Sequence, residues 1–172
     1  MKRIPRTEAI AWIEAEAVRA RGCPMCGTAR GERPTWHRLG ESEHAVAVLD
    51  RLATTRGHSI VIAKRHVERV RDFTREEYLD LQALVRDMTE RLEEKLEPTR
   101  VYIASLGSPT ARPTTFPHIH FHLVPIFGTD DHWRPARIFT WQEGGWIYDD
   151  AEAAAHADTL RLPIPARAAG PA

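Results

Sequence analysis

The sequence predicts an α+β domain built on an antiparallel sheet, on the basis of three observations. Short apolar runs with the length of strands lie on both sides of one long segment with helical periodicity. Helical patterns also occur near both ends of the chain. Strands separated by one long helix, with further helices at the ends, are typical of α+β architecture. With 172 residues the chain can bury one substantial core, so we expect one domain with appendages.

The long helix is the best-defined element of this prediction. Thr74 and Glu77 have the spacing of a capping box, and Pro98 stops the helix after about Leu96. One face of the segment is apolar at helical spacing, through Tyr78, Leu81, Val85, Met88 and Leu92.

Short apolar runs on both sides of the helix predict the strands of the sheet. Each run is bounded by polar residues, glycine or proline, as strands commonly are. The predicted strands are 36–39, 45–49, 59–63, 101–105 and a last one within 116–127.

Additional elements are expected outside this sheet. Thr7 can cap an N-terminal helix that Gly22 ends, which puts the cysteine pair that follows in a turn. Near the other end, the sequence indicates strands around 137–141 and 146–148 and an Ala-rich helix around 151–161. We therefore divide the chain into an N-terminal helix (1–22), a main domain (23–130), a C-terminal extension (131–162) and a tail expected to be disordered (163–172).

The charge balance argues against several classes of partner. The chain has 24 basic and 24 acidic residues, so no overall field attracts nucleic acid or an anionic membrane. No stretch approaches the ~20 apolar residues of a membrane span, and residues 1–22 carry charges where a signal peptide would be apolar. We expect a soluble, cytoplasmic protein that binds neither nucleic acid nor membranes. An anionic substrate must then be held by a local site.

Three of the nine histidines fall at alternate positions in the segment FPHIHFHLVPIF, residues 116–127. In a strand, His118, His120 and His122 share one face, and the apolar residues between them share the other. The outer two lie ~13 Å apart along a strand, whereas metal bonds to His nitrogen are only ~2.0 to 2.1 Å long. A regular strand therefore does not bring all three to one ion, although neighbouring histidines can chelate together.

Three interpretations of this run compete: histidines satisfied by local hydrogen bonds, ligands of a hydrolytic metal, and groups that act on phosphate. Their alternation beside a CxxC unit favours a functional site over a structural role. Neutral imidazole is nucleophilic near pH 7, and a neighbouring imidazole can donate to a phosphate oxygen or deliver a proton to a leaving group. Several imidazoles that face one pocket suit attack on phosphorus.

The run resembles the signature of the histidine-triad (HIT) superfamily, in which apolar residues separate three histidines. C-P-M-C at 23–26, AVAVLD at 45–50, RGHSIVIAKRHV at 56–67 and the long capped helix occur in the order of that superfamily. The resemblance covers roughly residues 20–127. It implies an α+β domain that commonly forms homodimers through its long helix and sheet. It also implies nucleotidyl transfer or hydrolysis at an α-phosphate.

Site residues follow from the resemblance by position. His120 matches the nucleophile, which forms a covalent nucleotidyl-histidine, and His122 matches the residue that orients it. His58 would contact the phosphate, and Asp50 would bind the ribose hydroxyls. The implied substrates are nucleoside phosphoramidates, dinucleoside polyphosphates or related nucleotides.

The zinc-containing branch of the superfamily is similar to this chain in a further respect. Its metal ligands correspond here to Cys23, Cys26, His66 and His118. Cys2His2 makes a closed tetrahedral site, so the resemblance implies a structural zinc ion. The alternative for the two cysteines is a redox pair, which usually begins a helix in a thioredoxin-like setting.

The loop before the histidine run departs from the pattern of the superfamily. Its sequence, SLGSPTARPTTF, lacks the usual Asn and Gln, although Thr115 stands at the position of the serine or threonine that serves the phosphate or leaving group. This loop motivates an alternative, a catalytically weak nucleotide-binding or scaffold protein. Beyond the main domain, Trp133, Trp141 and Trp146 either stack on a base or cover an exposed edge of the core.

Overall fold

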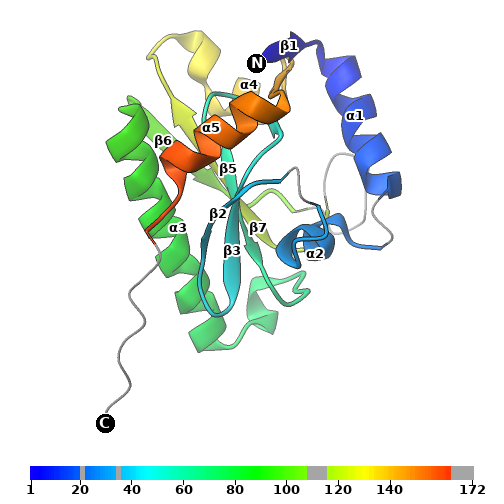
Figure 1. Ribbon diagram of the computed structural model, residues 1–172, viewed down its shortest axis with the longest axis vertical. Coiled ribbons are helices and arrows are strands. Elements are labelled where there is room, and N and C mark those ends of the chain that lie inside the picture. The colour runs from blue at the N-terminus through cyan, green and yellow to red at the C-terminus, as the bar shows by residue number, and fades with distance from the viewer. Residues whose placement is uncertain (20–21, 34–35, 108–115, 164–172) are drawn as a thin grey trace.

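The computed structural model describes residues 1–19, 22–33, 36–107 and 116–163. Its centre is a five-stranded antiparallel sheet with the strand order β2-β3-β5-β7-β6 (Figure 1). The predicted α+β architecture is therefore confirmed. The five strands are β2 (Arg38–Glu41), β3 (Ala45–Leu49), β5 (Ser59–Ala63), β6 (Arg100–Ala104) and β7 (His120–Ile126).

Two helices that contact each other, α3 (Arg75–Leu96) and α5 (Asp150–Leu160), cover one face of this sheet. The predicted capping box of Thr74 and Glu77 begins α3, and Asp149 forms a second capping box at the start of α5. The buried face of α3 packs against inward residues of the sheet such as Ala47 and Val61. It consists of Leu81, Leu84, Val85, Met88 and Leu92.

A short helix, α2 (Pro24–Ala29), packs on the opposite face of the sheet through Met25 and Ala29. Because both faces are covered, every residue of β3 and β5 is buried. Cys23 is the N-cap of α2, and Pro24 occupies the first turn, where its missing N–H costs nothing. The turn predicted for the cysteine pair is therefore wrong, since Cys26 lies inside this helix.

A second antiparallel sheet, of which the sequence predicted only one strand, joins the N-terminal strand to the C-terminal extension. Its order is β1-β8-β4, and its strands are β1 (Lys2–Ile4), β4 (Leu52–Ala53) and β8 (Gly145–Ile147). From β1 the chain enters α1 (Arg6–Arg19), which lies on the side of the molecule away from α3 (Figure 1). Thr7 is inside α1 and does not cap it, because the carbonyl of Pro5 accepts the hydrogen bond from the Ala9 N–H.

The C-terminal extension differs from the prediction in one element. Residues 137–141 were expected to be a strand, but Pro135 begins a helical turn, α4 (Pro135–Ile138), and β8 is the only strand of the predicted pair. Proline favours the first turn of a helix because its φ is already helical. The remaining short helices are η1 (Val70–Asp72) and η2 (Asp131–Trp133). Residues 164–172 of the expected tail lie outside the described residues.

The observed bounds of the other strands differ little from the predicted ones. β2 begins two residues after the predicted 36–39, and β6 begins one residue before the predicted 101–105. No helix among the described residues combines the length and the apolar character needed to cross a membrane.

Candidate functional site

The histidine run is only partly a regular strand. β7 begins at His120, so His118 precedes it, and the prediction that all three histidines share one face of a strand is wrong for His118. The Ile119 N–H donates 2.7 Å to the carbonyl of Val67, outside the sheet ladder, which turns this part of the backbone away from the strand path. His120 and His122 do share one face. They pair with Ile62 and Ile60, whose side chains belong to the apolar cluster beneath α2.

Four potential metal ligands meet where α2 approaches the start of β7. The ligand atoms of Cys23, Cys26, His66 and His118 all lie within 4.8 Å of one another. His118 Nδ1 is 3.4 Å from Cys23 Sγ and 3.3 Å from Cys26 Sγ, and His66 Nδ1 is 3.3 Å from Cys26 Sγ. These are the four residues that the resemblance implied, brought together from three separate parts of the chain.

The surroundings of the cluster orient its two imidazoles for metal binding. His118 Nε2 donates to the carbonyl of Ala63 at 2.8 Å, so the lone pair of Nδ1 points at the sulfurs. His66 Nε2 lies 3.1 Å from Glu68 Oε1, and a carboxylate behind a ligating histidine is a common outer partner in zinc sites. Burial and the adjacent Cys23 raise the pKa of Cys26 to about 11, so two thiolates here need a cation. Two sulfurs and two nitrogens match the ligands of a tetrahedral zinc ion.

A chain of hydrogen bonds fixes the tautomers of His58 and His122. The backbone N–H of Thr54 donates to His58 Nδ1 at 3.1 Å, so the proton of a neutral His58 is on Nε2. His58 Nε2 lies 3.0 Å from His122 Nδ1 and donates to it, which leaves the His122 proton on Nε2. Burial lowers the pKa of His58 to about 3 and that of His122 well below its usual value, so both rings are neutral at pH 7.

His120 has the opposite tautomer. Its Nδ1 donates to the carbonyl of His118 at 2.7 Å, so Nε2 keeps an unshared electron pair. Burial lowers the pKa of His120, which keeps that pair free of a proton near pH 7. The rings of His120 and His122 lie edge to face with their centroids 4.9 Å apart. The site therefore places an imidazole with an unprotonated ring nitrogen beside one whose N–H can donate a hydrogen bond.

A narrow cavity of about 70 Å³ opens beside these two rings. Its walls are mainly apolar, and Asp50, Arg33 and Glu16 are its charged groups. Arg33 forms an ion pair with Glu16, and its guanidinium lies 4.7 Å from the centroid of the Trp36 ring. The aromatic residues are Trp12, Trp36, Phe116 and Trp141. The sequence analysis did not identify Trp12, Glu16, Arg33 or Trp36 as site residues, because none belongs to a recognisable motif.

Asp50 lies at the end of β3 and reaches the same cavity. Its Oδ1 accepts from the N–H of Leu52 at 3.1 Å, and its Oδ2 is 3.6 Å from His58 Nδ1, beyond hydrogen-bond distance. Burial raises the pKa of Asp50 to about 7, against the opposing effects of the Leu52 N–H and of Arg33. Asp50, His58 and His122 are close enough to bind a metal. Hydrogen bonds, however, already use both nitrogens of His58.

Thr115, the remaining candidate from the sequence, lies outside the described residues, with the rest of segment 108–115. The other candidates divide into two groups. His58, His120, His122 and Asp50 surround one site, whereas His66 and His118 join the cysteines in the other. The carbonyl of His118 links the two groups through its hydrogen bond with His120.

Comparison with known proteins shows the family. The family model of the HIT domain matches residues 31–129. An uncharacterized HIT-like protein of Mycoplasma genitalium is 33% identical over 110 residues, 62% of this chain and 74% of that protein. Adenosine 5'-monophosphoramidase hnt1 of Schizosaccharomyces pombe is 27% identical over 103 residues, 60% of this chain and 73% of that protein.

A solved structure extends the comparison to the fold. The zinc-bound histidine triad family protein from Mycobacterium smegmatis superposes with a TM-score of 0.57 and 26% identity, over 81% of this chain and 95% of that one. More than half of the present chain matches the family model. The chain therefore belongs to the HIT domain family.

Proposed function

We propose that the protein is a nucleotide hydrolase or nucleotidyl transferase in which His120 attacks an α-phosphorus. The observation that carries this proposal is the hydrogen bond from His120 Nδ1 to the carbonyl of His118. It leaves Nε2 as an unprotonated nucleophile beside a cavity that also contains a buried carboxyl group, Asp50. The substrate class is a nucleoside phosphoramidate, a dinucleoside polyphosphate or a related nucleotide. The similarity to a fungal adenosine 5'-monophosphoramidase supports the first of these.

The reaction would proceed in two displacements. In the first, a bond forms between His120 Nε2 and phosphorus while the bond from phosphorus to the leaving group breaks. In the second, water attacks the same phosphorus, the phosphorus–nitrogen bond breaks, and the mononucleotide is released. The water proton goes to solvent, and His120 regains its free electron pair.

The neighbouring side chains would stabilise charge and position the substrate. The His122 Nε2–H can donate to a phosphoryl oxygen, because His58 holds the His122 ring by its other nitrogen. Asp50 would accept from the ribose hydroxyls. The aromatic walls offer Trp12 and Trp36 for stacking with the base. A cavity of about 70 Å³ is smaller than a nucleoside requires, so binding must shift these side chains.

We further propose a structural zinc ion held by Cys23, Cys26, His66 and His118. When bound, this ion would join α2 to the start of β7 and neutralise the two thiolates. His118 would then bind the metal through its side chain and hold His120 through its carbonyl. The chemical step itself needs no metal, because the nucleophile and its donor lie in the other group of residues. A cytoplasmic location would keep the cysteines reduced.

Replacement of His120 tests the catalytic proposal. We expect His120→Ala to lower turnover of adenosine 5'-phosphoramidate and diadenosine triphosphate by at least about 10⁴-fold, as loss of a covalent nucleophile does elsewhere. Circular dichroism and zinc content should remain unchanged. His44→Ala, at a half-buried histidine that does not line the cavity, is the matched control and should keep full activity.

Reactions with labelled nucleotide, quenched in alkaline detergent because the phosphorus–nitrogen bond is labile in acid, distinguish the proposal from its rival. A phosphoramidate adduct on the wild type that is absent from His120→Ala supports the covalent mechanism. Nucleotide binding without any adduct or turnover would instead favour the nucleotide-binding protein that the unusual 105–117 loop suggested. Wild-type turnover by His120→Ala would exclude the mechanism.

A further inference from the structure

A second cavity, of about 250 Å³, adjoins the first on the other side of Trp141. The two cavities divide the histidines between them. His120 lines only the first, His58 lines only the second, and His122 lines both. Trp141 is the other residue common to both linings, so its indole forms a wall between them. This residue comes from the C-terminal extension, outside the part of the chain that the family model matches.

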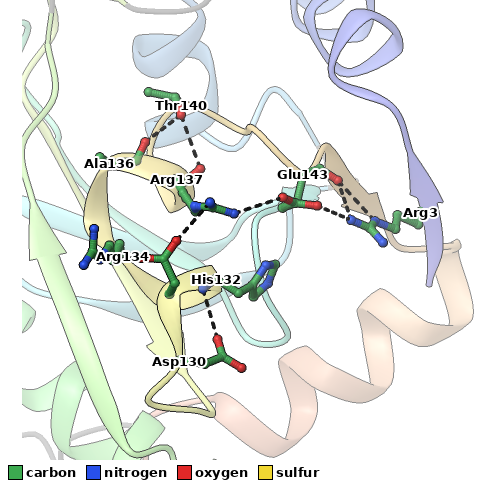
Figure 2. A network of polar contacts seen from close by, with 9 residues as sticks. Arg3, Asp130, His132, Arg134, Ala136, Arg137, Thr140 and Glu143 are labelled. Atoms are coloured by element: carbon green, nitrogen blue, oxygen red, sulfur yellow. Dashed lines mark hydrogen bonds and ion pairs between the residues drawn. The ribbon is translucent and has the colours of Figure 1, made fainter.

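The backbone of Trp141 is held in an unfavourable conformation. Its φ is 49°, in the left-handed region, where a bulky side chain is rare. Two arginines from the N-terminus secure the flanking residues: Arg6 Nε donates 3.1 Å to the carbonyl of Thr140, and Arg3 donates twice to the carbonyl of Glu143. Figure 2 shows Arg3 and Arg137 on either side of Glu143. The ion pair between Arg3 and Glu143 joins β1 to the turn that contains Trp141. Strain that is maintained by several contacts often marks a functional position.

The two cavities differ in charge. The first contains Asp50 and the Glu16–Arg33 ion pair. The second contains Arg6 and, among the described residues that line it, no carboxylate. Only Nε of Arg6 is used in the hydrogen bond to Thr140, and Arg6 forms no ion pair within the described ranges. The second cavity therefore suits an anion next to the phosphorus site.

We propose that the second cavity is a compartment for a phosphorylated leaving group, bound by Arg6 and separated by Trp141 from the nucleoside. This inference rests on the proposed function and narrows its substrate class. It favours substrates whose leaving group carries phosphate, such as dinucleoside polyphosphates and nucleoside diphosphates, over simple phosphoramidates.

The positions of the histidines agree with this assignment. In phosphoryl transfer the attacking and leaving atoms lie roughly in line on opposite sides of phosphorus. His120 attacks from the first cavity, and a phosphoryl group held by His122 sits where the two cavities meet. The leaving group then departs into the second cavity, past His58 and toward Arg6. The bond to the leaving oxygen breaks with its electron pair, and the departing phosphate carries the negative charge that Arg6 attracts.

Binding of nucleotide pairs tests the compartment without turnover. The full-length His120→Asn variant is titrated by calorimetry with AMP and ADP, and with GMP and GDP, which differ only in the β-phosphate. We expect the diphosphate to bind about ten- to a hundredfold more tightly. Arg6→Gln should remove this preference and change monophosphate affinity less than about twofold. Arg6→Lys keeps the charge and should keep most of the preference. Lys2→Gln, an exposed cation on β1, should have no effect.

A second measurement varies the salt concentration and keeps Arg6 in place. Raising salt from about 0.05 to about 0.5 M should reduce the ratio of diphosphate affinity to monophosphate affinity, because screening weakens a partly exposed ion contact. Equal affinities for mono- and diphosphate, or equal weakening of both by Arg6→Gln, would overturn the compartment while leaving His120 chemistry intact. If neither purine pair binds to the wild type, the proposed function fails as well.

Discussion

The three histidines of the run present their ring nitrogens differently to their surroundings because each ring has a different hydrogen-bond partner. The carbonyl of Ala63 turns His118 Nδ1 toward sulfur, and the carbonyl of His118 leaves His120 Nε2 free. The N–H of Thr54 places the His58 proton on Nε2, and this N–H in turn leaves the His122 proton on its own Nε2. The sequence predicted which residues gather here. It did not predict their tautomers, since these depend on which backbone N–H or carbonyl the folded chain places beside each ring nitrogen.

The burial of His58 makes stability depend on pH. Its pKa falls from 6.5 to about 3 on folding, so between these values the unfolded chain binds more protons, and stability is lost as pH falls. Asp50 acts in the opposite direction between pH 3.8 and about 7, because its pKa is raised. We expect His58→Gln to reduce the loss of unfolding free energy between pH 6.5 and 5 by about 2 kcal/mol. Urea unfolding of the wild type and of the variant at several pH values measures this difference. If unfolding free energy falls equally steeply with pH in both proteins, the prediction is contradicted.

Tyr148 is expected to hold the loop that carries His58. Its hydroxyl, fully buried, accepts from the N–H of Gly57 at 2.9 Å. Tyr148→Phe leaves that N–H without a partner, which should cost about 1 to 3 kcal/mol of unfolding free energy and lower kcat. Tyr102→Phe is the matched control, because the Tyr102 hydroxyl donates to the carbonyl of Trp133 away from the site. Equal losses of kcat in both variants would argue against a positioning role for Tyr148.

At the scale of elements, prediction succeeded where the pattern was long or wholly apolar. The strands β3 and β5 and the start of α3 were predicted at their observed bounds. Of the second sheet only β8 was predicted; β1 and β4 were missed because strands of two or three residues show no periodicity. The helix α2 was missed for a related reason: it spans six residues and owes its position to packing of Met25 on the sheet.

The proposed metal should determine the stability of α2. Cys26→Ser removes a ligand from within this helix, so zinc content should fall from about one ion per chain to nearly none, and the thermal midpoint should drop. Because Pro24 and Met25 line the first cavity, nucleotide affinity should fall too. Zinc is measured by elemental analysis of protein purified under reducing conditions.

Glu68→Gln is the control for this experiment. It keeps all four ligands and weakens only the hydrogen bond behind His66, so metal affinity should fall about ten- to a hundredfold while the isolated protein retains zinc. Wild-type protein purified without any metal, but with a disulfide between Cys23 and Cys26, would favour the redox interpretation.

At the scale of the whole molecule, segments on both sides of the matched HIT domain complete the lining of the first cavity. The matched HIT domain ends at residue 129, yet Trp12 of α1 and Trp141 of the extension line the first cavity. The second sheet holds both in place, because β8 pairs with β1 on one side and with β4 on the other. The predicted division into four segments stays a prediction. Of the two roles considered for Trp141, covering the core agrees with its packing against the buried Ile4, Ala9 and Leu52, and stacking on a base stays a prediction. Its place in the lining of both cavities was not indicated by any local pattern in the sequence.

The expected homodimer is also a property of the whole molecule. In the described part of the chain, β6 pairs only with β7, so its outer edge can accept another strand. Ile103 is 49% exposed on β6, on the same face as Val101, which packs in the core beneath α3. An exposed apolar residue on an open edge strand favours pairing with a second copy. Two sheets joined through β6 would also bring the two α3 helices to the same side.

Ile103→Lys should therefore separate the dimer, because edge lysines oppose strand pairing. Light scattering should give twice the 19.5 kDa chain mass for the wild type and the single mass for the variant. Val18→Lys, at a residue 85% exposed on α1, is the control and should remain dimeric. A monomeric wild type, or an Ile103→Lys variant of unchanged mass, would show that β6 is not the interface. Because Ile103 lines neither cavity, the monomeric variant should keep nucleotide binding.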